Sequence, residues 1–217
     1  MKIILTGATG FVGSEVLREL IACESVTAIT CLSRSEIRLQ SSKVTTVLHE
    51  DFANYNGALL ERLSDHRACI WAMGGKASDL GDELARITHT STLEFAEGMA
   101  AYTQEYDHSF AFCYLSGMGA DPTESAWLPW EKQTRRLKGR TELDLQALSD
   151  RYPAFGAYSF RPGGVLPPDA NRLVEFALAP IVVNVGTLAK AMVSVAVDPS
   201  IAQPTIYNAD IKQIAQR

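Results

Sequence analysis

The sequence has no hydrophobic run long enough to span a bilayer. Its longest apolar stretch, residues 176–183, contains Pro180, whereas a membrane-spanning helix needs about 20 apolar residues. It also has no excess of positive charge, because 20 Lys and Arg stand against 25 Asp and Glu and give a net charge of -5. Such a chain repels nucleic acid and anionic membranes at long range. We therefore expect no membrane partner and no nucleic-acid partner.

Cysteine is scarce as well. The four cysteines have no close pairing, and the four histidines lack metal-ligand spacing, so the sequence predicts no metal site and no redox pair. The apolar segment at the N-terminus is broken by Gly7 and is too short for a signal peptide. We expect a cytoplasmic protein whose cysteines are small buried side chains.

The sequence does contain an ordinary share of apolar residues, 47%, together with 21% charged residues. This composition is typical of globular proteins, and 217 residues suit one domain with a full core. No repeat, linker or low-complexity tract divides the chain. We therefore predict a single domain over residues 1–217.

Short apolar runs alternate along the chain with segments whose apolar residues recur at helical spacing. The runs are continuous and rich in β-branched residues, as expected of parallel strands covered on both faces. We predict strands at residues 2–6, 26–32, 44–48, 69–73, 110–115, 155–160 and 205–208, and helices at 11–23, 56–63, 83–106 and 130–148. This order predicts an α/β fold, a Rossmann-like doubly wound parallel sheet with helices on both faces.

A glycine-rich turn, GATGFVG at residues 7–13, joins the first predicted strand to the first predicted helix. Gly7 permits the tight turn, Gly10 leaves room for a pyrophosphate, and Gly13 allows helix and strand to pack closely. The start of the helix then directs N–H groups at the phosphates. The alternative is a turn with a purely structural role. The predicted dinucleotide contacts are Gly7, Thr9, Gly10, Phe11, Val12 and Gly13.

The end of the second predicted strand indicates which dinucleotide binds. Ser33 and Arg34 stand there, and no carboxylate is present to accept hydrogen bonds from a free ribose 2'-hydroxyl. A hydroxyl and a guanidinium suit a 2'-phosphate. We therefore expect NADP as the cofactor and consider NAD less favoured. The alternative is that Arg34 only decorates a surface loop.

Further short segments follow the predicted elements in a fixed order. They are DF (residues 51–52), WAMGG (71–75), LSGMGA (115–120), KGRTE (138–142) and RPG (161–163). With the glycine turn, they resemble the atypical branch of the short-chain dehydrogenase/reductase superfamily, which is related to extended dehydrogenases and to NAD-dependent epimerases and dehydratases. The resemblance covers nearly the whole chain and implies NAD(P) binding. The cofactor contacts that it adds are Asp51, Phe52, Ala72, Met73, Gly74, Lys138, Pro162 and Gly163.

The resemblance also implies a catalytic Tyr four residues before the helical Lys and a catalytic Ser on the fifth strand. In this chain Thr134 stands four residues before Lys138, and no tyrosine is followed by a lysine at that distance. A threonine hydroxyl is a far weaker acid than a phenol, whose pKa is about 10. Ser116 either contacts the substrate oxygen or satisfies backbone groups. Lys138, Ser116 and Thr134 are therefore the catalytic candidates, with Lys138 and Thr134 on one helix face.

The sequence thus predicts an NADP(H)-dependent oxidoreductase or isomerase that acts on a small carbonyl or alcohol substrate. The alternative is a catalytically silent NADP(H)-binding sensor or regulatory protein. Residues 162–200 would shape the substrate side as a minimal subdomain or form a homodimer surface, so the protein is expected to be a monomer or a homodimer. Four residues ahead of the lysine helix are candidates to replace the missing acid: Asp121, Glu124, Ser125 and Glu131.

Overall fold

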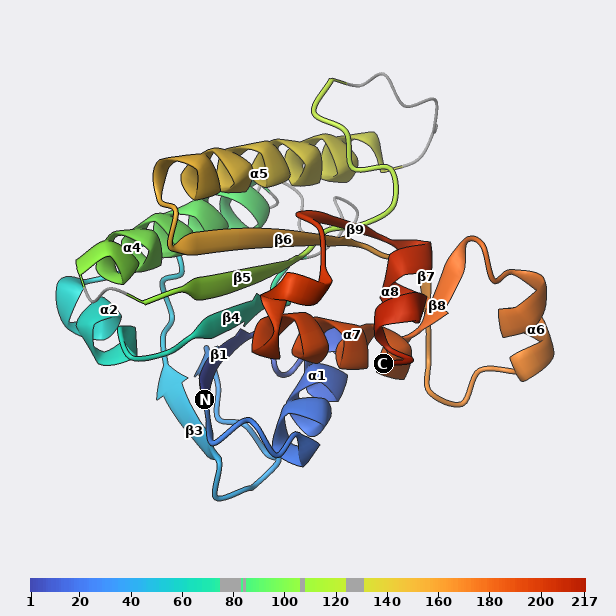
Figure 1. Cartoon of the computed structure of the whole chain (residues 1–217), viewed down its shortest axis with the longest axis horizontal. Coiled ribbons are helices and arrows are strands. Elements are labelled where there is room, and N and C mark those ends of the chain that lie inside the picture. Colours follow the sequence, from blue (N-terminus) through green and yellow to red (C-terminus); the bar gives the residue numbers. More distant parts are fainter. Residues whose placement is uncertain (75–82, 84, 106–107, 124–130) are drawn as a thin grey trace.

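A computed structural model describes residues 1–74, 83, 85–105, 108–123 and 131–217 of the chain. Within these residues a parallel seven-stranded sheet has the order β3-β2-β1-β4-β5-β6-β9 (Figure 1). Its strands are β1 (Lys2–Thr6), β2 (Ala28–Ser33), β3 (Val44–Leu48), β4 (Ala68–Trp71), β5 (Phe110–Leu115), β6 (Phe155–Arg161) and β9 (Thr205–Tyr207). The predicted Rossmann-like α/β fold is confirmed.

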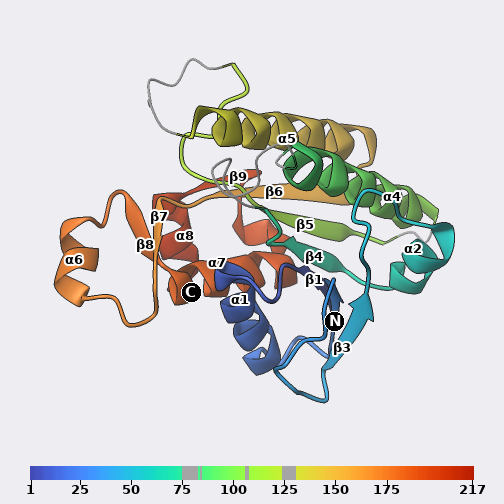
Figure 2. The same ribbon diagram turned by 180° about the vertical axis from the view of Figure 1, so that it is seen from behind.

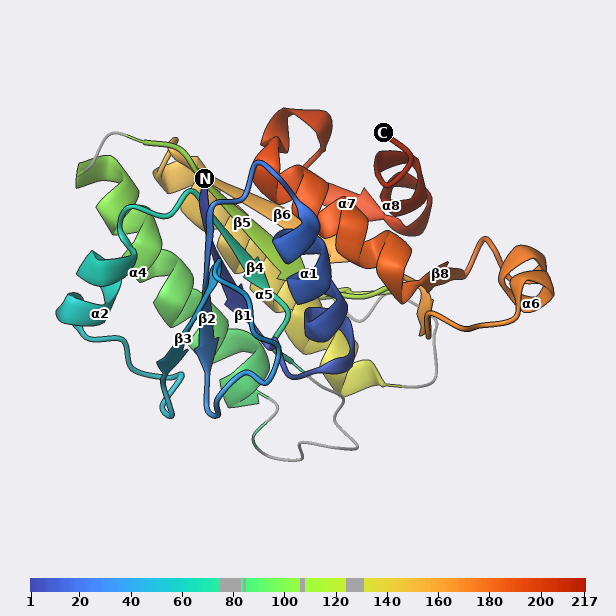
Figure 3. The same ribbon diagram turned by 90° about the horizontal axis from the view of Figure 1, so that it is seen from below.

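Helices cover both faces of the sheet (Figure 3). On one face lie α1 (Phe11–Ala22), α7 (Val185–Val197) and α8 (Asn208–Ile214), and on the other lie α2 (Gly57–Leu63), α4 (Ser91–Glu105) and α5 (Lys132–Arg151). Side chains alternate between the faces along each strand, so Ile3 and Leu5 pack with α1 and α7 while Ile4 packs with α2 and α4. The sheet is therefore buried on both sides. Among the described residues, no helix is both long enough and apolar enough to cross a membrane.

The helix predicted at 83–106 is divided in the structure. A π-helical turn, η2 (Arg86–Thr90), precedes α4, and residues 84 and 106 lie outside the described residues. The helix predicted at 130–148 is α5, which begins at Lys132 and ends at Arg151. Trp130 lies outside the described residues. Pro153 stops the helix because the residue before a proline avoids helical backbone angles.

Residues 162–200, which we expected to shape the substrate side, separate into two parts. The first part forms a small parallel sheet of β7 (Gly164–Leu166) and β8 (Val182–Asn184), with α6 (Arg172–Ala177) between them. This part projects from the main body (Figure 2). The second part is α7, which packs against α1 in the core, and the short turn η3 (Pro199–Ile201) follows it. The second part of the segment therefore belongs to the core.

Candidate functional site

A cavity of about 670 Å³ lies at the carboxyl ends of β1, β4, β5 and β6. The strand order reverses between β1 and β4, and in open α/β sheets ligands bind at this kind of switch point. The lining includes many of the residues expected to form the site: Gly10, Phe11, Val12, Ala72, Met73, Gly74, Ser116, Thr134, Lys138, Pro162 and Gly163. The fold thus brings together segments that are far apart in the sequence.

The glycine turn between β1 and α1 is tightly packed. Gly7 has a φ of +69°, and a Cβ at this position would lie 2.5 Å from the carbonyl oxygen of Ala72. A Cβ on Gly13 would lie 2.0 Å from the carbonyl oxygen of Gly7. Gly7 and Gly13 are absent from the cavity wall, as is the exposed Thr9. The two glycines shape the turn that presents Gly10 to the cavity.

The start of α1 is suited to an anion. Gly10 is the N-cap residue, no side chain caps this end of the helix, and the first turn contains no acidic residue. The first N–H groups of a helix lack intrahelical acceptors and carry the positive end of the helix dipole. Because Gly10, Phe11 and Val12 line the cavity, this positive potential is directed at whatever occupies it.

Lys138 contributes a second positive group to the cavity, from α5. Its Nζ donates a hydrogen bond to the backbone oxygen of Ser116, 2.8 Å away. Burial lowers the pKa of Lys138 to about 8, and the nearby Glu142 carboxylate acts in the opposite direction. The ammonium has three donors, and the contact with Ser116 occupies one of them. Lys138 is therefore held in place by β5.

Ser116 lines the cavity, and its hydroxyl is engaged in a hydrogen bond. It donates to the carboxylate of Glu142, which is buried. Arg161, at the end of β6, donates from Nε to both oxygens of that carboxylate at 3.0 and 2.9 Å. A buried carboxylate is tolerated only when such donors satisfy it. In the structure the Ser116 hydroxyl therefore supports the Glu142–Arg161 ion pair, a contact that the sequence did not predict, and its expected catalytic role stays a prediction.

Replacing Glu142 by Gln tests this ion pair. Glu142→Gln should lower the free energy of unfolding by about 2 kcal/mol, because the hydrogen bonds from Ser116 and Arg161 lose their charged acceptor. Chemical denaturation measures the change. Glu97→Gln is the matched control, since Glu97 forms an exposed ion pair with Arg151 and should leave the denaturation midpoint unchanged. Equal midpoints for the two variants would contradict the supporting role of Glu142.

Thr134 and Glu131 form a hydrogen-bonded pair on the cavity wall. The Thr134 hydroxyl donates to Oε2 of Glu131 at 2.8 Å, and both residues line the cavity with Lys138. Thr134 and Lys138 therefore share one face of α5, as predicted. Of the other candidates for the missing acid, Asp121 is absent from the lining and accepts hydrogen bonds from Thr123. Glu124 and Ser125 lie outside the described residues.

Ser33 and Arg34 lie at the carboxyl end of β2, beyond the cavity wall. The buried Ser33 hydroxyl accepts a hydrogen bond from the backbone N–H of Ser35 at 3.2 Å. Arg34 is exposed at the same sheet edge as the glycine turn. A group extending from the cavity along this edge would meet the Arg34 side of β2.

Asp51 and Phe52 follow β3 at this edge and are also absent from the cavity wall. The Asp51 carboxylate accepts from the Asn54 side chain, which is the main reason why the pKa of Asp51 lies below its usual value. The Phe52 ring is buried and packs edge-on against Trp71, with centroids 6.4 Å apart. The Phe52 side chain is thus part of the core.

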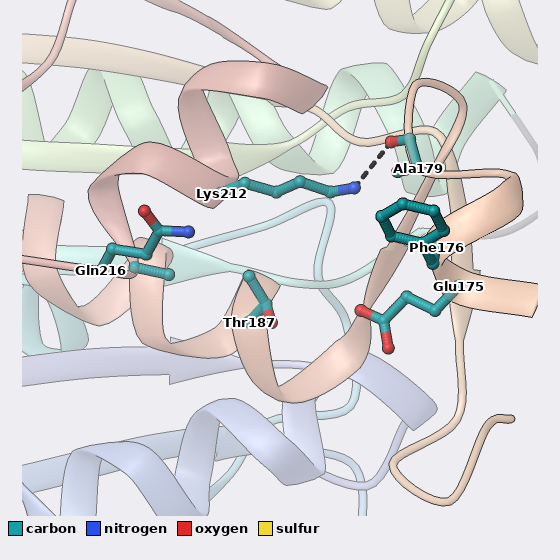
Figure 4. Close-up of a pocket in the computed structure, with 7 residues that line it drawn as sticks. Glu175, Phe176, Ala179, Thr187, Lys212 and Gln216 are labelled. Carbon is teal, nitrogen blue, oxygen red and sulfur yellow. Dashed lines mark hydrogen bonds between the residues drawn. The ribbon is translucent and has the colours of Figure 1, made fainter. Parts of the chain in front are cut away.

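A second depression, of about 370 Å³, lies between α6 and α8 (Figure 4). Glu175 and Phe176 border it on one side and Gln216 on the other. The Lys212 ammonium donates to the backbone oxygen of Ala179 at 2.6 Å. This contact ties the projecting segment to α8, and none of the predicted site residues lies there.

Sequence reasoning did not assign a role to Glu142 or Arg161. Glu142 stands four residues after Lys138, which places it on nearly the same face of α5. This spacing is the one local signal that could have marked it. Arg161 pairs with Glu142 across 19 residues, and no local pattern announces that contact.

The fold and the cavity define a Rossmann-type architecture with a cavity at its switch point. The family model named NAD_binding_4 and described as "Male sterility protein" matches residues 5–64. Protein FMP52, mitochondrial, from Meyerozyma guilliermondii is 32% identical over 74 residues. That match spans 34% of this chain and 32% of the relative, so the chain matches about a third of the relative's length.

Solved structures resemble the whole chain. A short-chain dehydrogenase from Burkholderia cenocepacia in complex with NADP has a TM-score of 0.68 at 16% identity, covering 99% of this chain and 91% of that one. The Bordetella bronchiseptica enzyme WbmF in complex with NAD+ has a TM-score of 0.68 at 14% identity, covering 99% and 76%. The predicted resemblance to short-chain dehydrogenases and related enzymes is confirmed at the level of the fold.

Proposed function

We propose that this protein binds NADP(H) and acts as an oxidoreductase or isomerase on a small carbonyl or alcohol substrate. The observation that carries this proposal is the pairing of two positive groups on one cavity, the start of α1 and the Lys138 ammonium. Neighbours in fold that hold NADP or NAD+ support a nicotinamide cofactor. A substrate panel of aldehydes, ketones and alcohols, with NADPH or NADP+ followed by absorbance, tests the activity.

The residues present fit such a cofactor. No side chain caps the start of α1, and Gly10 has no side chain of its own, as the approach of a pyrophosphate requires. Lys138 would donate to the nicotinamide ribose, while Met73 and Pro162 would border the ring. When bound, the nicotinamide supplies or accepts a hydride at the substrate carbon. The chain itself has to orient the substrate and to move the accompanying proton.

The preference for NADP rests on Arg34, and its removal is a direct test. Arg34→Ala should weaken NADPH binding by about 10- to 100-fold, because one charge-assisted contact with the 2'-phosphate is lost. NADH binding should change little. Calorimetric titration of both cofactors measures the difference. Arg62→Ala, at an exposed position on α2, is the control, and equal losses for NADPH and NADH would contradict the proposed specificity.

A second candidate function is a catalytically silent NADP(H)-binding sensor or regulatory protein. It is favoured by the commitment of the Ser116 hydroxyl to Glu142 and by the threonine in the position of the expected phenol. Tight NADPH binding without turnover of any substrate in the panel would favour this alternative. The cytoplasmic location and the monomeric or homodimeric state remain predictions.

A further inference from the structure

Glu131 adopts a backbone conformation that is costly for its residue type. Its φ of 53° and ψ of 31° lie in the left-handed region, and no other described non-glycine residue has a positive φ. Leaving the usual helical region in this way costs roughly 1–2 kcal/mol for a residue with a Cβ. Such conformations cluster at functional sites, where the surrounding structure enforces them. Here the conformation places Glu131 on the wall of the cavity.

The carboxylate of Glu131 is joined to the one hydroxyl that stands in the position of the missing phenol. Thr134 donates to Oε2 of Glu131 at 2.8 Å, and Lys138 lies one turn further along the same helix face. Thr134 alone cannot release or supply a proton near neutral pH. A carboxylate that is hydrogen-bonded to the Thr134 hydroxyl removes this difficulty. The carboxylate can accept the proton of the hydroxyl while the hydroxyl takes the proton of the substrate.

We propose that Glu131 is the proton acceptor and donor of this site and acts through the Thr134 hydroxyl. This inference rests on the function proposed above. In alcohol oxidation the substrate hydroxyl proton passes to Oγ1 of Thr134 while the Thr134 proton passes to Oε2 of Glu131. The carbon–oxygen double bond forms as a hydride, with its electron pair, leaves the same carbon for the nicotinamide. Glu131 then releases its proton to water, and carbonyl reduction follows the reverse path.

The hydrogen bond in the structure already has the direction that oxidation requires, with Thr134 as the donor and Glu131 as the acceptor. The Lys138 ammonium on the same wall favours the substrate alkoxide as the proton leaves. The Ser116 hydroxyl also donates to a carboxylate, but that carboxylate, Glu142, is already engaged by Arg161 and is absent from the cavity lining. An ion-paired carboxylate is the weaker proton acceptor.

Substitutions at both positions test the relay. Glu131→Gln should lower kcat by about 100-fold and remove the dependence of kcat on the ionisation of a carboxyl group, with NADPH affinity unchanged. Thr134→Val should cause a similar loss, whereas Thr134→Ser retains the hydroxyl and should keep most of the activity. Glu61→Gln, on the exposed side of α2, is the matched carboxylate control and should behave as wild type.

A stability measurement supplies a readout that does not depend on activity. Glu131→Gly and Glu131→Ala both lose the hydrogen bond from Thr134, but only glycine also removes the Cβ that makes the left-handed conformation costly. The glycine variant should therefore melt about 2–4 °C higher than the alanine variant. Glu131→Gln keeps the Cβ and should leave the melting temperature of wild type unchanged.

The possible failures are distinguishable. If wild type binds NADPH but turns over no substrate, the proposed enzymatic function fails and the relay fails with it. If wild type is active and Glu131→Gln keeps the full rate at every pH, the relay alone is overturned. A Glu131→Gly variant that melts no higher than Glu131→Ala would overturn the argument from backbone conformation.

Discussion

Gly13→Ala is expected to lower the free energy of unfolding by more than about 4 kcal/mol and to abolish cofactor binding. The added Cβ would lie 2.0 Å from the carbonyl oxygen and 2.6 Å from the carbonyl carbon of Gly7. Both atoms belong to the backbone, so no side chain can rotate to make room. Gly7 cannot retreat either, because it already packs against the backbone of Ala72. Chemical denaturation and calorimetric titration with NADPH measure the two effects.

Two other glycines provide controls for this prediction. Gly57→Ala, at the start of α2, would place its Cβ 4.0 Å from its nearest neighbour, the Tyr102 hydroxyl. This substitution should leave the free energy of unfolding unchanged or raise it by up to about 1 kcal/mol relative to wild type. Gly10→Ala, with its Cβ 3.2 Å from the Gly7 oxygen, should fold but bind NADPH more weakly, because the methyl group stands where the pyrophosphate approaches. A Gly13→Ala protein as stable as wild type would contradict this account of the turn.

Lys138→Met is expected to weaken NADPH binding by about 10- to 100-fold, because the charged donor on the cavity wall is lost. The variant should remain folded, since methionine has a similar length and needs no solvation. Calorimetric titration at neutral pH measures the affinity. The exposed Lys190, on α7, provides a matched control, and Lys190→Met should bind as wild type does.

The same variant should alter the pH dependence of stability. Burial lowers the pKa of Lys138 from 10.5 to about 8 in the folded protein. Between these pH values the unfolded chain still holds the proton and the folded protein does not, so this group stabilises the fold increasingly as the pH rises. This increment in the free energy of unfolding reaches about 3 kcal/mol above pH 10.5 and is lost as the pH falls through about 8.

Denaturation of wild type and Lys138→Met, below pH 8 and near pH 10, isolates this increment. Other groups titrate in the same range, but they are common to the two proteins, so the difference between the proteins reports Lys138. The free energy of unfolding of wild type, minus that of Lys138→Met, should rise by a few kcal/mol as the pH rises. A difference that stays constant over this range would contradict a lowered pKa for Lys138.

Much of the fold could be predicted from the sequence because its signals are local. The apolar run at residues 110–115 predicts a strand, because a continuous apolar run of this length between turns suits a buried strand. The structure confirms it as β5. In α7, by contrast, eight side chains are buried, and the polar face is narrow, with only Thr187, Lys190 and Ser194 at helical spacing. This signal is weak beside the apolar residues around it, and the prediction from sequence did not include the helix. The strands β7 and β8 span three residues each and pair across the intervening helix α6, so no local pattern predicts them.

The sequence by itself determined the glycine turn and the placement of Thr134 and Lys138 on one helix face. Both follow from constraints within a few residues: the backbone space at Gly7 and Gly13, and the period of the α-helix. The tertiary structure alone decided what surrounds that face. Ser116 meets Glu142 across 26 residues, and the pKa of Lys138 depends on what buries it. These contacts depend on how α5 packs over β5 and β6, and packing between distant segments leaves no signature in the local sequence.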